Sequence, residues 1–141
     1  MSSTMLLRLA GIVGVLGIAV GAFGDHALPD LLSDLSESEL AEREGWLKTG
    51  ATYHMYHALA LLAVAVADHK WNRAFRVSAL AWLLGIVLFS GSLYAMSLTG
   101  IRVLGAIVPL GGIAYMLGWG MLLASAGRGG GDADASTLLA N

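Results

Sequence analysis

Four long runs of apolar residues divide the chain, and more polar stretches separate them. The runs cover Leu6 to Phe23, Ala51 to Ala67, Val77 to Leu98 and Val103 to Ala126. Each is close to the roughly 20 residues that a helix needs to cross the hydrocarbon core of a bilayer. The pattern therefore predicts an all-α integral membrane protein with four transmembrane helices. The second run is the most polar of the four because it contains His54 and His57.

The composition favours the same class. Apolar residues make up 57% of the chain and charged residues 13%, and there are 19 glycines against 2 prolines. Packed membrane helices use glycine where soluble helices avoid it. The formal net charge of −2 argues against a nucleic-acid partner, because a nucleic-acid surface needs a basic stripe. The chain has no cysteine, which excludes disulfides, thiol catalysis and thiolate metal sites.

The four runs leave no room for a separate soluble domain. We expect residues 1–126 to form one membrane domain. The remaining residues, 127–141, contain three consecutive glycines and two aspartates but few apolar residues. This composition predicts a flexible cytoplasmic tail.

The distribution of basic residues predicts the orientation. Four spans place both termini on one side of the membrane, and Lys and Arg concentrate on the cytoplasmic side. The side with the termini would carry Arg8, Lys70, Arg73, Arg76 and Arg128, and the other side Arg43, Lys48 and Arg102. We therefore expect both termini in the cytoplasm and the acidic segment after the first span on the outside.

That acidic segment, Asp25 to Lys48, contains helical signals. Its first leucines recur at helical spacing, and Ser36 followed by Glu39 has the spacing of a capping box. We predict a short amphipathic segment on the outer membrane surface, with a solvated acidic loop as the alternative. The tryptophans are expected to anchor helix ends at the interface; they are Trp46, Trp71, Trp82 and Trp119.

Small residues recur along one face of three predicted spans. The glycines in these stripes include Gly14, Gly17, Gly21, Gly85, Gly111 and Gly112. Lipid gives helices little hydrophobic drive to associate, so contact depends on close packing at small residues. We predict that these glycines pack a four-helix bundle, with contact to a second subunit as the alternative. The stripe also favours a retained first span over a cleaved signal peptide, and Pro109 is expected to kink the fourth span.

Several short motifs resemble the DUF423 family. They are Gly21-Ala22-Phe23-Gly24-Asp25-His26-Ala27-Leu28, Tyr53 to Leu62, Phe89 to Tyr94, Pro109 to Gly112, and Gly118-Trp119. They stand in the family's order between about Leu6 and Leu123. The resemblance implies a small multi-span protein of the bacterial inner membrane whose biochemical role is uncharacterised, and it brings no catalytic residues. Asp25 and His54 depart from the residues common in the family, so a function resting on them would be peculiar to this chain.

Four polar residues are expected near the outer end of the bundle: His26, His54, His57 and Arg102. His54 and His57 are one helical turn apart and could share a metal ion with His26 or Asp25, while His26 and His57 could clamp a haem. Such a histidine pair is weak support for either site. The favoured interpretation is that the histidines bond neighbouring carbonyls or tyrosines, so we predict no metal and no cofactor.

The pattern favours a non-enzymatic accessory or assembly component of the membrane. Its expected partners are the lipid bilayer and another membrane protein or a second copy. A small transporter or channel built on the His/Arg cluster is one alternative, and a metal- or haem-binding membrane subunit is another. No uninterrupted line of polar residues crosses the predicted bundle, which argues against transport.

Overall fold

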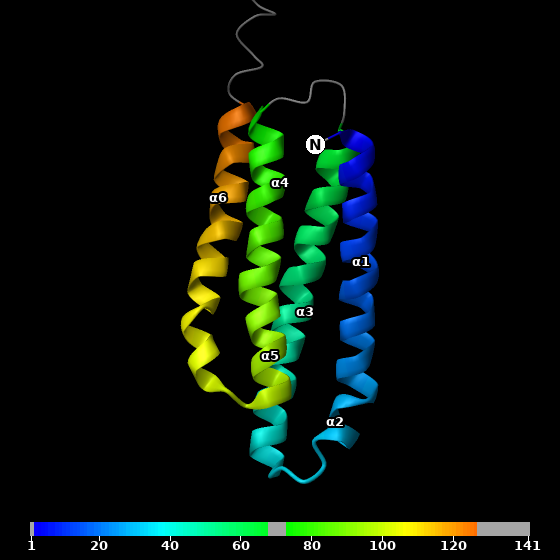
Figure 1. The fold of residues 1–141 in the computed structure, drawn as a ribbon, viewed down its shortest axis with the longest axis vertical. Coiled ribbons are helices and arrows are strands. Elements are labelled where there is room, and N and C mark those ends of the chain that lie inside the picture. The colour runs from blue at the N-terminus through cyan, green and yellow to red at the C-terminus, as the bar shows by residue number, and fades with distance from the viewer. Residues whose placement is uncertain (1, 68–72, 127–141) are drawn as a thin grey trace, which may run out of the picture.

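Four long helical rods stand side by side in the computed structural model, which describes residues 2–67 and 73–126 (Figure 1). The first two rods are α1 (Ser3–His26) and α3 (Glu37–Val66), joined by the short helix α2 (Leu28–Leu31). The third comprises α4 (Arg73–Gly85), the π-helix η1 (Ile86–Ser90) and α5 (Gly91–Thr99). The fourth comprises the 3₁₀ turn η2 (Arg102–Ala106) and α6 (Val108–Ala126). Over the described ranges every regular element is helical, which confirms the all-α prediction.

The four rods form two pairs, and α3, a member of the first pair, also contacts the second pair. Helix α1 packs mainly on α3, α6 packs mainly on α4, and α3 also contacts η1 and α5. Both ends of the described chain lie at the same end of the bundle, and α2 lies at the other (Figure 1). The predicted tail, 127–141, lies outside the described residues, as do Lys70 and Trp71.

Large aliphatic side chains cover the outside of the bundle. Val15 is 67% exposed and Leu123 is 77% exposed, whereas Ser90 and Ser97 are completely buried. This distribution is the reverse of that in a soluble bundle and is typical of helices that face lipid. Three stretches are long and apolar enough to cross a membrane: Ser3–His26, Phe75–Thr99 and Arg102–Ser125.

Helix α3 is not among these three stretches, although we predicted a span from Ala51 to Ala67. Its histidines and tyrosines lower its apolarity. It nevertheless runs alongside the other rods (Figure 1). The evidence that α3 belongs to the bundle is therefore its contacts with α1, η1 and α5, and not its mean hydropathy.

One continuous helix of 30 residues replaces the predicted surface segment and second span. The capping box is present: Ser36 is the N-cap of α3, and its hydroxyl donates to the Glu39 carboxylate at 2.8 Å. The hydrogen bonds from Ser36 also lower the pKa of Glu39. The helix runs through Gly50, where the missing side chain admits Tyr94; a Cβ would lie 2.7 Å from its Cε1. The prediction of a separate surface helix is therefore wrong for the part that lies in α3.

Pro109 begins a helix instead of kinking one. Helix α6 starts at Val108, so Pro109 occupies the first turn, where its missing N–H leaves no helical bond unmade. The chain changes direction earlier, at Gly100, whose φ of 73° lies in the left-handed region that favours glycine. The expected kink inside the fourth span is wrong for this reason.

The predicted glycines divide into two groups. A Cβ at Gly17 would lie 3.2 Å from Met55 Cε, one at Gly85 2.5 Å from Tyr115 Cε1, and one at Gly111 2.7 Å from Phe89 Cβ. These three let neighbouring rods approach closely. The structure corrects the expectation for Gly14, Gly21 and Gly112, where a Cβ would have no atom of a neighbouring rod within 4 Å. These three are half-buried but do not bring a neighbouring rod into close contact.

Candidate functional site

His57 lies in the bundle with both ring nitrogens engaged. Its side chain is 4% exposed and stacks on the ring of Tyr115, with 3.5 Å between centroids and an interplanar angle of 4°. The indole N–H of Trp119 donates to Nε2 at 3.2 Å. An indole nitrogen can only donate, so Nε2 is the acceptor and Nδ1 carries the proton. Nδ1 accordingly donates to the carbonyl oxygen of Tyr53 at 2.7 Å, and the imidazole is neutral.

His54 is equally buried, one turn before His57, and contacts different rods. Its Nε2 lies 2.9 Å from the carbonyl oxygen of Val13 on α1, to which it donates. Its Nδ1 lies 3.0 Å from the hydroxyl of Tyr94 on α5. In a neutral imidazole Nδ1 is then the acceptor, and the tyrosine hydroxyl donates. His54 thus joins the first and third rods to α3.

Ser90 closes the π-helix and bonds two other rods. Its hydroxyl donates to the carbonyl oxygen of Gly50 at 2.8 Å, and the Tyr115 hydroxyl lies 3.2 Å from the same serine oxygen. Because the single Ser90 hydrogen is used at Gly50, Tyr115 is the donor of the second bond. π-Helical turns occur frequently at functional sites. This one places Ser90, which is completely buried, between α3 and α6.

These side chains form one polar layer across the bundle, which we call the histidine–tyrosine layer. Its members are His54, His57, Ser90, Tyr94, Tyr115 and Trp119. Through the carbonyls of Val13, Gly50 and Tyr53 it connects all four rods. The layer runs across the bundle rather than along it, so it ties the helices together and does not form a polar path from one end to the other.

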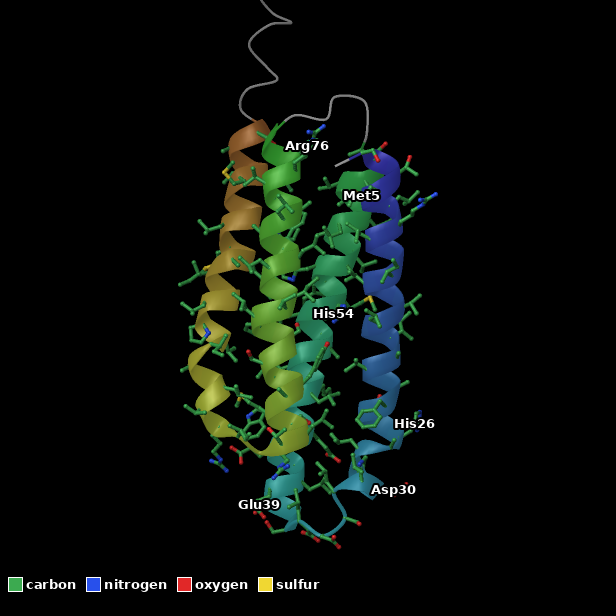
Figure 2. All side chains as sticks on the ribbon, viewed as in Figure 1. Met5, His26, Asp30, Glu39, His54 and Arg76 are labelled. Atoms are coloured by element: carbon green, nitrogen blue, oxygen red, sulfur yellow. The ribbon has the colours of Figure 1, made fainter. Side chains whose placement is uncertain are left out.

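The predicted cluster of His26, His54, His57 and Arg102 does not assemble. His26 is exposed in the last turn of α1, at the α2 end, whereas His54 lies inside the bundle (Figure 2). The α1 contact of His54 is Val13, 13 residues before His26, which is about 20 Å along a helix. The sequence prediction placed the two at one level because it began the second span near Ala51, whereas α3 begins at Glu37.

Arg102 belongs to a different contact. It forms an ion pair with Glu42 of α3, and its guanidinium carbon lies 5.8 Å from the ring centroid of Trp46. Beside it, Arg43 Nη1 donates to the carbonyls of Ser97 and Leu98 at the end of α5. The first turns of α3 thereby hold the corner between α5 and η2. Arg102 acts here as a structural group.

The donor geometry does not suit a shared metal ion. The rings of His54 and His57 point toward different rods and have both nitrogens occupied. Among residues 2–67 and 73–126, no group of three His, Cys, Asp or Glu side chains is arranged to hold a metal ion.

Two tryptophans differ from the expected interface anchors. Trp82 is completely buried in the core, and Trp119 donates its N–H to His57. Sequence reasoning also missed Ser90 and Tyr115 as members of the layer. Their signal is hydroxyl groups in apolar spans, where lipid offers no partner, but the same signal is given by Ser78 and Ser97, whose buried hydroxyls make no hydrogen bond. Trp46 does lie at a rod end, under Arg102.

The comparisons with known proteins agree with the motifs. The family model described as "Protein of unknown function (DUF423)" matches residues 20–112. The membrane protein YwdK of Bacillus subtilis is 43% identical over 86% of this chain and 95% of its own. The inner membrane protein YgdD of Escherichia coli is 38% identical over 91% of this chain and 93% of its own. A membrane protein of Haemophilus influenzae is 39% identical over 80% and 86%. No solved structure matches the chain.

Proposed function

Because the chain belongs to the DUF423 family, whose relatives are membrane proteins, we propose that it is a non-enzymatic, four-span component of the bacterial inner membrane that supports the assembly of other membrane proteins. The observation that carries the proposal is the histidine–tyrosine layer. In this layer both nitrogens of each buried histidine are already bonded within the protein. A catalytic or transporting histidine needs a nitrogen that can reach a substrate or exchange a proton.

The layer instead suits a rigid scaffold. Hydrogen bonds between membrane helices fix their positions because the surrounding lipid offers no competing partners. The bonds of His54, His57 and Ser90 join α3 to each of the other rods. Rods held in this way present a constant outer surface to another membrane protein. An accessory component therefore migrates in a native complex larger than its own 14.6 kDa when membranes are dissolved in a mild detergent.

The first prediction concerns topology. We propose that α3 crosses the membrane in addition to the three apolar stretches, and that both termini are cytoplasmic. Both ends of the described chain lie at one end of the bundle, which accords with this topology (Figure 1). The chain has no cysteine, so single cysteines report cleanly. A cysteine at Ser38 should react with a membrane-impermeant thiol reagent in intact cells, and one at Thr4 should react only after the cells are opened. The reverse labelling would invert the orientation, and labelling of both in intact cells would mean that α1 does not cross the membrane.

The second prediction separates a scaffold from the transporter alternative. Purified protein in liposomes that contain a pH-sensitive dye should give no proton flux above that of protein-free liposomes. A flux that disappears in His54→Gln but persists in His26→Gln would overturn the proposal, because His26 is exposed and lies outside the layer. The same preparation tests the metal- or haem-binding alternative through its absorption spectrum and metal content.

A further inference from the structure

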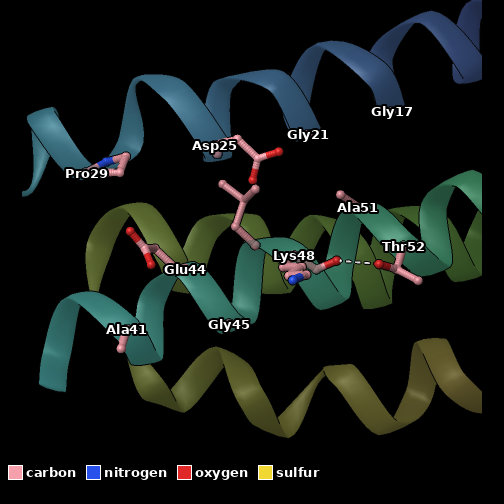
Figure 3. A pocket seen from close by; sticks show the side chains of 12 residues that line it. Gly17, Gly21, Asp25, Pro29, Ala41, Glu44, Gly45, Lys48, Ala51 and Thr52 are labelled. Carbon is pink, nitrogen blue, oxygen red and sulfur yellow. Dashed lines mark hydrogen bonds between the residues drawn. The ribbon is translucent and has the colours of Figure 1, made fainter.

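A groove of about 610 Å³ opens between α1 and α3 near the α2 end of the bundle (Figure 3). Half of its lining residues are glycine or alanine: Gly17, Gly21, Gly24, Ala41, Gly45 and Ala51. A methyl group placed on Gly21 would have no neighbouring atom within 4 Å, so this side of α1 is open to the groove. The histidine–tyrosine layer is a separate site and leaves this space unexplained.

The charged residues of the groove lie nearer the α2 end than its deepest glycine and alanine. Asp25, Glu44 and Lys48 line it toward the α2 end, and Gly17 and Ala51 line it deeper in the bundle. From Asp25 to Gly17 the groove follows eight residues of α1, which is about 12 Å along the helix. Thr52 also lines the deep part of the groove, but its hydroxyl already donates a hydrogen bond to the carbonyl oxygen of Lys48 at 2.8 Å.

The three charged groups have no ion-pair partners in the described part of the chain, whose salt bridge joins Arg102 to Glu42. The carboxylate of Asp25 lies between the two helices (Figure 3). Two carboxylates and one ammonium therefore face the groove with no salt bridge between them, and they leave one negative charge in excess. A ligand that carries both a cation and an anion would complement them.

We propose that this groove binds one molecule of a zwitterionic phospholipid with a primary ammonium headgroup, phosphatidylethanolamine. The ammonium would lie against Asp25 and Glu44, and the phosphate against Lys48. An acyl chain would run inward past Gly21, where a Cβ would have no neighbouring atom within 4 Å.

The charges select this headgroup over others. Phosphatidylglycerol has no cation and would bring a negative phosphate to two carboxylates. Phosphatidylcholine has a cation but no N–H to donate, so it would lose the charge-assisted hydrogen bonds. A helix of a second copy is a less suitable occupant, because it would bury the three charged groups without supplying counter-charges. The inference is independent of the proposed accessory role and needs only that the groove faces the bilayer.

The test fills the groove without disturbing the helix contact. Gly21→Leu should keep its thermal stability in detergent, since the position is open, but should lose phosphatidylethanolamine about tenfold in a titration followed by native mass spectrometry. Gly14→Leu is the matched control, because Gly14 is equally open but does not line the groove. Equal lipid binding by the two variants would overturn the proposal.

A second pair of variants tests the charges. Asp25→Asn combined with Glu44→Gln should remove the preference for phosphatidylethanolamine over phosphatidylglycerol. Asp30→Asn combined with Glu37→Gln makes the same charge change outside the groove and should keep the preference. A parent protein that binds the two lipids equally would contradict the headgroup assignment. A parent dimer that Gly21→Leu converts to monomers, with no lipid bound, would assign the groove to a second copy instead.

Discussion

Gly111→Ala is expected to destabilise the bundle severely although it adds only one methyl group. The new Cβ would lie 2.7 Å from Cβ and 2.8 Å from Cα of Phe89, and still closer to its backbone nitrogen. These atoms belong to the backbone and first side-chain carbon of η1, so no flexible side chain can move aside. Overpacking of this kind costs about 1–3 kcal/mol, and backbone displacement places this variant at about 3 kcal/mol. Thermal unfolding in a mild detergent measures the loss.

Gly112→Ala is the matched control. It makes the same change one residue later, where nothing lies within 4 Å of the new methyl group. It should unfold near the temperature of the parent or slightly above it, since alanine favours a helix over glycine by about 1 kcal/mol. If the two variants unfold together, the close crossing of α6 over η1 is not present in the protein.

The sequence predicted the rods better than their ends. Apolar length placed three of them, because the lipid requirement acts on every residue of a span. The second rod was located but its start was misplaced by 14 residues, at Ala51 instead of Glu37. A separate helix was expected after the capping box of Ser36 and Glu39. At Gly50 the helix packs closely against Tyr94, which lies 44 residues further along the chain, and local pattern cannot reveal such a contact.

The site was predicted only in part. The interpretation of the histidines as partners of carbonyls and tyrosines agrees with the bonds that His54 and His57 make. The pairing of particular residues could not be predicted, because it depends on the π-helical turn that rotates Ser90 toward α3 and α6. Insertion of one residue in a helical turn leaves no clear pattern in an apolar segment. The expected cluster around Arg102 failed because Glu42 lies beyond the predicted span and was not considered as its partner.

His57→Leu is the second substitution with a large expected effect. It removes the acceptor of the Trp119 N–H, which costs about 1–3 kcal/mol where lipid offers no other partner, whereas the Tyr53 carbonyl keeps its bond within the helix. It also removes the stacking on Tyr115, and aromatic pairs contribute about 0.5–1.5 kcal/mol. We expect a total loss of about 2–4 kcal/mol in unfolding free energy, measured in the same detergent assay.

Two further variants separate the causes. His26→Leu makes the same chemical change at an exposed histidine outside the layer and should leave stability unchanged. His57→Phe retains an aromatic ring for Tyr115 but has no nitrogen, so it should recover the stacking and not the hydrogen bonds. A loss for His57→Phe between those of the parent and His57→Leu would therefore give the two contributions separately. If His57→Leu were as stable as His26→Leu, the bonds of the layer would not hold α6 to α3, and a scaffold based on them would lose its physical basis.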